Sequence, residues 1–147
     1  LQVNAIKAEA RKIKNEIPDL GLIAIDYVQL VGASRRYGSR EQEVADVTRN
    51  LKILAGELNV PVILCSQINR QHETNGDKRP QMSSLRESGE LEQTADLIGF
   101  LYREDYYEEG SENEGLCELL IKKNRNGPTG TVMLEFEKET MTFTDAF

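Results

Sequence analysis

Histidine, cysteine and long apolar segments are all scarce in this chain of 147 residues. His72 is the only histidine, and without a second one to form a catalytic dyad we interpret it as a solvated loop residue. Cys65 and Cys117 show no metal-ligand spacing, which predicts two small buried side chains in a reducing cytosol and no disulfide framework. No apolar run approaches the roughly 20 residues that span a bilayer, and no signal peptide is recognisable at the start. These absences favour a cytoplasmic protein that makes no membrane contact.

A phosphate-binding loop of the form Gly-x-x-x-x-Gly-Lys-Ser/Thr is also absent. The nearest glycine pair, Gly32 and Gly38, has the wrong spacing and is followed by Ser39 and Arg40. The 25 acidic residues outnumber the 18 basic ones, and the formal net charge of −7 means that any contact with nucleic acid must be local. The length fits a single domain over residues 1–147.

The stretch from Leu22 to Leu30 organises the rest of the chain. An amphipathic helix over 3–17 precedes it, and then an unbroken apolar run ends at Asp26. This pattern predicts a strand buried on both faces that delivers a carboxylate to its carboxyl end, as α/β nucleotide sites do to hold Mg²⁺. A strand-end or helix-capping aspartate gives the same pattern and remains an alternative. The loop at 31–38 carries two arginines and is either solvated or faces a substrate.

A helix and a second apolar strand follow. Ser39 and Gln42 fit a capping box at the start of the helix. One face of this helix is apolar at Val44, Val47, Leu51, Leu54 and Leu58. Because a strand, a helix and a strand of this length predict a right-handed parallel crossover, Asp26 and Gln67 should emerge at the same edge of the sheet. The Gln67 amide can then bond a bound phosphate or, alternatively, a loop at the strand end.

The middle of the chain alternates between loops and short elements. Residues 69–81 are polar and rich in turn formers, which predicts a loop. Two short helical turns separated at Gly89 should follow, and then a third strand over 96–103. The acidic run from Glu104 to Glu114 predicts a flexible surface loop.

The last third predicts an antiparallel meander of strands over 116–123, 131–136 and 141–144. The predicted fold class is therefore α/β, with a mainly parallel sheet flanked by helices and closed by this carboxyl-terminal β-meander. Lys123 and Arg125 lie at the first hairpin tip. Such a tip is either simply solvated or supplies two cations to an anion site on a neighbouring molecule.

Four blocks of the sequence together resemble the carboxyl-terminal part of the RecA-like motor domain of DnaB-type bacterial replicative DNA helicases. The blocks are residues 25–30, 60–70, 78–89 and 122–130. The resemblance covers nearly the whole chain, and only the acidic loop around 106–115 stands outside it. It implies a partial RecA-like P-loop NTPase core, an ATP-dependent helicase activity, and ATP and Mg²⁺ as cofactors.

The resemblance also implies roles for single residues. By similarity, Asp26 is the Walker B aspartate that holds Mg²⁺ through water, and Gln67 senses the γ-phosphate of ATP. Arg125 resembles the arginine finger, with Lys123 as its companion, and both act on ATP bound to the adjacent subunit.

The family likeness further implies DNA contacts and partners. The segment that matches the loop gripping the single-stranded DNA backbone consists of Arg86, Glu87, Ser88 and Gly89, and Arg70 is a further candidate. Main-chain amides there suit sequence-independent phosphate contacts. The implied partners are single-stranded DNA, five further copies in a homo-hexameric ring, a primase and a helicase loader.

The missing phosphate-binding loop departs from the family pattern. We expect that loop to precede Leu1 in a longer protein, and we expect this chain alone not to hydrolyse ATP. An unpaired sheet edge beside Asp26 would favour dimerisation or edge pairing, which analytical ultracentrifugation can detect. The alternatives are another RecA-like ATPase, such as a recombinase or phage primase-helicase, and a non-catalytic DNA- or helicase-binding module. A phosphate-binding loop encoded upstream in frame supports the helicase, whereas a start codon at Leu1 supports the module.

Overall fold

The structure, a computed structural model, describes residues 1–69 and 78–146. These residues form two compact units. Unit 1 contains residues 1–69 and 85–95, and the described part of unit 2 contains residues 78–84 and 96–146. Each unit has its own sheet. The expectation that all 147 residues make one domain remains a prediction.

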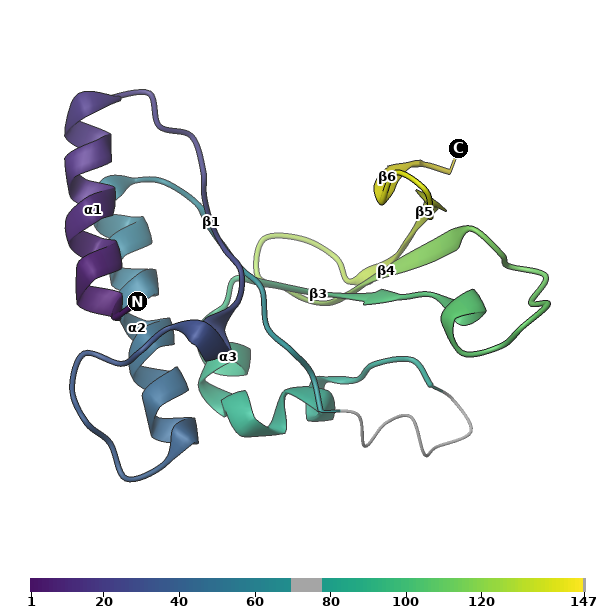
Figure 1. The fold of residues 1–147 in the computed structure, drawn as a ribbon, viewed down its shortest axis with the longest axis horizontal. Helices are drawn as coiled ribbons and strands as arrows, with labels where there is room; N and C mark the ends of the chain where they lie inside the picture. The colour runs from purple at the N-terminus through teal and green to yellow at the C-terminus, as the bar shows by residue number, and fades with distance from the viewer. Residues whose placement is uncertain (70–77, 147) are drawn as a thin grey trace. The chain divides into compact units, whose positions relative to one another are not determined.

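Unit 1 contains two long helices. Helix α1 (Val3–Glu16) lies beside α2 (Arg40–Leu58), as Figure 1 shows. The predicted apolar face of α2 is confirmed, because four of its five positions are buried and Leu58 is half-buried against the same core. On the outer side, Arg11 of α1 makes two hydrogen bonds of 2.6 and 2.8 Å to the Glu57 carboxylate of α2. No helix in the described ranges has the length and apolar character to cross a bilayer.

Local side-chain chemistry fixes both ends of α2. The Ser39 hydroxyl accepts a hydrogen bond of 3.3 Å from the Gln42 N–H, which confirms the predicted cap. The Gln42 side chain reaches back to the Gly38 N–H at 3.2 Å. At the other end Asn59 adopts the left-handed conformation, with φ of 50°, and closes the helix.

The sheet of unit 1 is the predicted parallel pair. Strand β1 (Ile23–Ile25) pairs with β2 (Val62–Leu64) in the register Ile23 to Val62. The prediction that both faces of the strand are buried is wrong, however, because Ala24 is exposed and Ile63 is 53% exposed. Ile23, Ile25 and Leu64 pack against the helical core, so helices cover one face of the pair.

The two cysteines differ in their surroundings. Cys117 is fully buried in unit 2, as predicted. Cys65 follows β2 directly and is exposed, so the prediction of a buried side chain there is wrong. Its apolar neighbours in the sequence reflect a strand with only one covered face.

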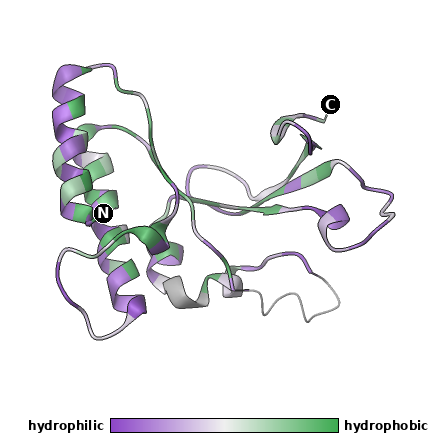
Figure 2. Cartoon of the chain, in the orientation of Figure 1, coloured by the Kyte–Doolittle hydropathy of each residue, from purple (hydrophilic) through white to green (hydrophobic). Residues whose placement is uncertain are grey.

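Unit 2 is built on a four-stranded antiparallel sheet. In the order of the sheet the strands are β3 (Leu97–Tyr102), β4 (Leu116–Asn124), β5 (Gly130–Glu137) and β6 (Thr142–Asp145). The predicted α/β class with a carboxyl-terminal meander is confirmed. Strand β3 joins the antiparallel set, so the parallel part consists of β1 and β2. Figure 2 shows apolar stretches along β3 and β4 and a largely polar loop between them.

That polar loop is anchored by a buried carboxylate, which the acidic composition did not reveal. Asp105 lies in the short 3-10 helix η4 (Glu104–Tyr106), and its side chain is only 4% exposed. It accepts hydrogen bonds from Arg103 at 3.1 and 3.2 Å and pairs with Lys138 at 3.0 Å. Burial alone would raise the pKa of the Asp105 carboxyl, but these bonds and one from the Gly115 N–H outweigh burial and hold the pKa at about 2.

We expect Asp105→Asn to remove part of the acid sensitivity of folding. Because the folded pKa lies below the ordinary value of about 3.9, the ionised carboxylate stabilises the native state above that value. This stabilisation, about 2 kcal/mol, is lost as the pH falls toward 2. Urea unfolding at a series of pH values should show a lower unfolding free energy for the variant at pH 7 and a flatter acid limb.

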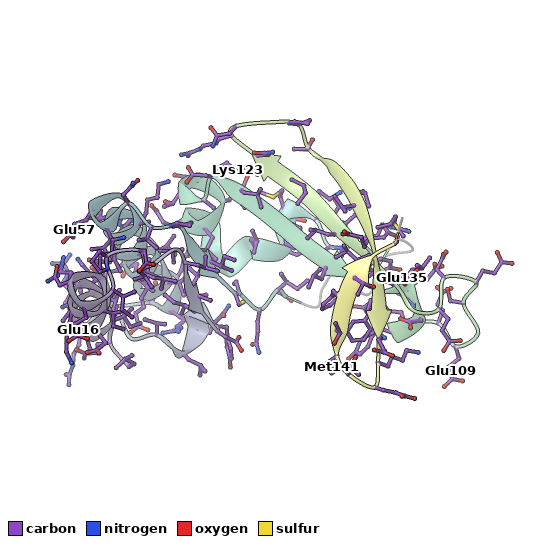
Figure 3. All side chains as sticks on the ribbon, turned by 90° about the horizontal axis from the view of Figure 1, so that it is seen from above. Glu16, Glu57, Glu109, Lys123, Glu135 and Met141 are labelled. Carbon is purple, nitrogen blue, oxygen red and sulfur yellow. The ribbon has the colours of Figure 1, made fainter. Side chains whose placement is uncertain are left out.

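The matched control is Glu109→Gln, in the same loop. Glu109 is exposed and projects away from the sheet in Figure 3. Its substitution should leave both the unfolding free energy and its pH dependence nearly unchanged. An Asp105→Asn variant with the wild-type acid limb would contradict the assigned role of the buried carboxylate.

Candidate functional site

Asp26 stands at the carboxyl end of β1, where main-chain pairing continues past the strand. The Cys65 N–H donates to the Ile25 carbonyl at 3.0 Å, and the Val28 N–H donates to the Cys65 carbonyl at 2.9 Å. Asp26 lies between these two bonds and is exposed. The ends of both strands are thereby held together, as the parallel crossover predicts.

Gln67 lies at the same edge. Its main chain is held by Gln29, a residue to which the sequence analysis assigned no role. The Gln29 side chain, in the 3-10 helix η1 (Val28–Leu30), donates to the Ser66 hydroxyl at 3.1 Å and to the Gln67 carbonyl at 3.2 Å. Its amide oxygen accepts from the Gln67 N–H at 3.2 Å. Gln29 therefore fixes the main chain of Gln67, and the Gln67 residue itself is exposed. In the sequence, Gln29 lies three residues after Asp26, within block 25–30 of the family resemblance.

This edge offers oxygen donors of the kind that hard cations take. They are the Asp26 carboxylate, the Ser66 hydroxyl and the Gln67 amide. Within residues 1–69 and 78–146, no three or more His, Cys, Asp or Glu side chains form a cluster that could hold a metal ion. Mg²⁺ typically uses one or two carboxylates and takes its other ligands from phosphates and water. The donor set fits such an ion, and the role of Asp26 in holding it stays a prediction.

The loop that carries two arginines is fixed to α2 by a buried carboxylate. Asp46 accepts hydrogen bonds from the Ser34 N–H at 2.6 Å and from the Tyr37 hydroxyl at 2.9 Å. Burial would raise the pKa of Asp46, but these bonds lower it below its ordinary value. The Arg35 guanidinium lies 5.0 Å from the centre of the Tyr37 ring, and both Arg35 and Arg36 are exposed. The loop is therefore bonded to α2, and both of its roles stay predictions.

The candidate DNA segment is the junction of two short helices, as predicted. The 3-10 segment η3 (Met82–Ser88) is followed directly by α3 (Gly89–Thr94). A Cβ atom added at Gly89 would meet nothing within 4 Å. Packing thus does not require glycine at this position. The side chains of Arg86, Glu87 and Ser88 and the whole of Arg70 lie outside the described structure.

Lys123 and Arg125 lie at the tip of the β4–β5 hairpin in unit 2. Lys123 pairs with Ile98 and is labelled near the end of β4 in Figure 3. The register shifts between Ile98 and Gly99, so β4 has one extra residue at this point, a β-bulge. Arg125 follows β4 and is bound to Asp96, with Nη1 at 3.2 Å from Oδ1. The structure thus places Asp26 and Gln67 at one sheet edge of unit 1, and Lys123 and Arg125 at one hairpin of unit 2.

Comparison with known proteins gives strong matches along nearly the whole chain. The family model described as the DnaB-like helicase C terminal domain matches residues 1–145. The replicative DNA helicase DnaB of Geobacillus stearothermophilus is 52% identical over 140 residues, which are 95% of this chain and 31% of that protein. The replicative DNA helicase DnaC of Bacillus subtilis (strain 168) is 51% identical over the same length and shares. The chain thus spans 31% of the length of these curated relatives.

Two solved structures agree with the sequence matches. One is described as an ATPase domain and matches with a TM-score of 0.95 and 45% identity, covering 99% of this chain and 52% of that one. A DnaB-like replicative helicase, whose structure is described together with its interactions with primase, has the same TM-score and identity and is covered over 36% of its length. These matches confirm the resemblance stated from the four sequence blocks, and with it the partial RecA-like core. The chain therefore belongs to the DnaB-like helicase C-terminal domain family.

Proposed function

We propose that this chain is the carboxyl-terminal part of the motor of an ATP-dependent replicative DNA helicase. The observation that carries the proposal is the edge of unit 1, where Asp26 and Gln67 follow two adjacent parallel strands whose ends are bonded together. In open α/β sheets, ligands bind outside the carboxyl ends of the strands. A carboxylate and an amide at this place suit a metal-bound nucleoside triphosphate.

The proposed chemistry divides the work between these residues. Asp26 holds and orients Mg²⁺, which when bound neutralises charge on the phosphates. Gln67 hydrogen-bonds to the γ-phosphate, and its main chain is tied through Gln29 to η1. Loss of the γ-phosphate therefore removes a contact that is linked, through these bonds, to the ends of both β1 and β2. Arg125, with Lys123, supplies positive charge to ATP on the adjacent subunit, so hydrolysis depends on how the subunits meet.

The proposed partners follow from the same interpretation. Single-stranded DNA lies against segment 86–89 and Arg70, and six copies form a ring in the cytoplasm without membrane contact. In such a ring, six copies of one loop converge on one DNA strand, which explains how an acidic chain can bind DNA. A primase and a helicase loader are the remaining proposed partners. One matched helicase is described with its primase interactions, which supports a primase partner here.

We expect Gly89→Ala to weaken DNA binding without harming the fold. The added methyl group meets nothing within 4 Å, and alanine favours the helical conformation. If a DNA phosphate approaches the backbone at this point, the methyl group hinders the contact. Affinity for a labelled oligothymidylate, followed by fluorescence anisotropy at fixed salt, should fall about tenfold, the equivalent of one hydrogen bond to a charged group.

Gly56→Ala is the matched control, because a Cβ atom at Gly56 in α2 also meets nothing within 4 Å. It should leave DNA affinity unchanged. Equal affinity of the Gly89→Ala variant and the wild type would remove Gly89 from the proposed DNA contact.

The overall proposal is tested on the full-length gene product that contains this chain. We expect Mg²⁺-dependent ATP hydrolysis that single-stranded DNA stimulates, together with unwinding of a forked duplex. Chelation of Mg²⁺ with EDTA should abolish both activities. A protein that binds DNA but neither hydrolyses ATP nor unwinds the fork would support the non-catalytic module instead.

A further inference from the structure

Arg125 is fixed to its own subunit by two bonds to one residue. Asp96 directly precedes β3 and Arg125 directly follows β4, so the antiparallel pairing brings them together although they are 29 positions apart. The Arg125 N–H donates to the Asp96 carbonyl at 2.9 Å. The Arg125 Nη1 also donates to the Asp96 Oδ1 at 3.2 Å. The first bond places the backbone of Arg125, and the second orients its guanidinium.

The turn that follows Arg125 is fixed as well. The Asn124 amide donates to the Pro128 carbonyl at 3.1 Å, and its oxygen accepts from the Asn126 N–H at 3.2 Å. A Cβ atom added at Gly127 would lie only 2.9 Å from the Asn124 Nδ2, so the turn closes tightly around this side chain. These bonds hold the backbone on both sides of Arg125, and none of them uses the Asp96 carboxylate.

The ion pair between Arg125 and Asp96 contributes little to the stability of the fold. The Arg125 and Asp96 side chains are 49% and 50% exposed. Pairs this exposed add little to stability because solvent screens them. The main-chain bond between the two residues persists whatever side chain stands at position 96. What the carboxylate does supply is a direction for the guanidinium.

We propose that Asp96 is a positioning residue that orients Arg125 toward the ATP bound on the adjacent subunit, and this inference rests on the proposed function. A guanidinium carries five N–H donors in a planar fork, so arginine can bind a carboxylate of its own subunit and a phosphate of its neighbour together. An arginine oriented in advance loses less conformational freedom when the neighbouring nucleotide arrives. The β-bulge in β4 sets the register at which this hairpin tip leaves the sheet.

The test is Asp96→Asn in the full-length gene product. The kcat of DNA-stimulated ATP hydrolysis should fall about tenfold, as expected for a misplaced charged group, with the Kd for nucleotide unchanged. The midpoint of urea unfolding should not move. Asp96→Glu, which retains the carboxylate, should recover part of the kcat. Glu139→Gln, at an exposed acid of the same unit, is the control and should behave as the wild type.

A second readout is independent of turnover. In ¹⁵N NMR spectra of the 147-residue chain, Asp96→Asn should shift and broaden the Arg125 guanidinium N–H signals, because Nη1 loses its bond to a carboxylate, while the Arg125 backbone amide stays protected from exchange. Wild-type kcat in Asp96→Asn would overturn the inference. A lower kcat accompanied by a lower unfolding midpoint or by loss of that amide protection would also overturn it, because Asp96 would then be structural. If Arg125→Ala itself retained turnover, the proposed function of Arg125 would fail first, which separates the two failures.

Discussion

Replacing Arg125 with alanine in the full-length gene product should nearly abolish ATP turnover while nucleotide binding remains. An arginine supplied by a neighbouring subunit stabilises charge that develops in the transition state, and its loss costs roughly 10³ to 10⁵ in rate. Nucleotide bound in the ground state gains less from it, so the Kd should change only slightly. Steady-state hydrolysis and binding of a fluorescent ATP analogue measure the two quantities separately.

Arg11→Ala is the matched control for this experiment. Arg11 is 44% exposed and bound to a carboxylate, as Arg125 is, but it lies in α1 of unit 1. Its loss should leave turnover unchanged. Retained turnover in Arg125→Ala would remove the finger assignment, whereas loss of nucleotide binding would indicate a general disturbance of the protein.

Asp26→Asn should give the second large loss. Asparagine keeps the shape of the side chain but removes the charge that holds Mg²⁺ beside the phosphates. We expect turnover to fall about 10³-fold, corresponding to roughly 4 kcal/mol of lost transition-state stabilisation. Because Asp26 is exposed at the end of β1, folding should be little affected.

A Mg²⁺ titration makes the Asp26 prediction more specific. The residual activity of Asp26→Asn should require a higher Mg²⁺ concentration than the wild type does. Asp19→Asn, an exposed carboxylate in the turn before β1, should leave both activity and Mg²⁺ requirement unchanged. If Asp26→Asn hydrolysed ATP at the wild-type rate, the metal assignment would have to be abandoned.

The sequence predicted those elements whose signals are local. Ser39 caps α2 through a residue three positions away, and the apolar face of α2 follows from helical spacing alone. The joint placement of Asp26 and Gln67 needed only one further rule, that strands joined by a helix run parallel. These predictions depend on near neighbours and on chain connectivity, which the sequence contains.

Contacts between distant residues could not be predicted in the same way. Arg79 makes hydrogen bonds of 2.9 and 3.2 Å from its Nε to the Glu118 carboxylate, and its guanidinium lies 4.9 Å from the centre of the Tyr102 ring. Arg79 and Glu118 are 39 positions apart. The buried Asp105 carboxylate pairs with Lys138, which directly follows β5. Such pairs depend on strand register, which composition and periodicity do not reveal.

The candidate site shows the same division. Asp26, Gln67 and Arg125 were recognisable from the family likeness of their sequence blocks. Gln29 and Asp96 were not, because each acts through main-chain and side-chain bonds to a residue about 30 or more positions away. Their bonds became visible only once the pairing of β1 with β2 and of β3 with β4 was known.

The most direct test of the central claim is a mixing experiment with full-length Asp26→Asn and Arg125→Ala subunits, co-expressed so that they assemble together. Each variant alone should be nearly inactive. In a mixed ring, an intact Asp26 site on an Arg125→Ala subunit can receive Arg125 from an Asp26→Asn neighbour. The account therefore predicts that ATP hydrolysis reappears in the mixture. If the mixture stayed as inactive as the separate variants, Arg125 would not act on the adjacent subunit, and the proposed division of the site between neighbours would be contradicted.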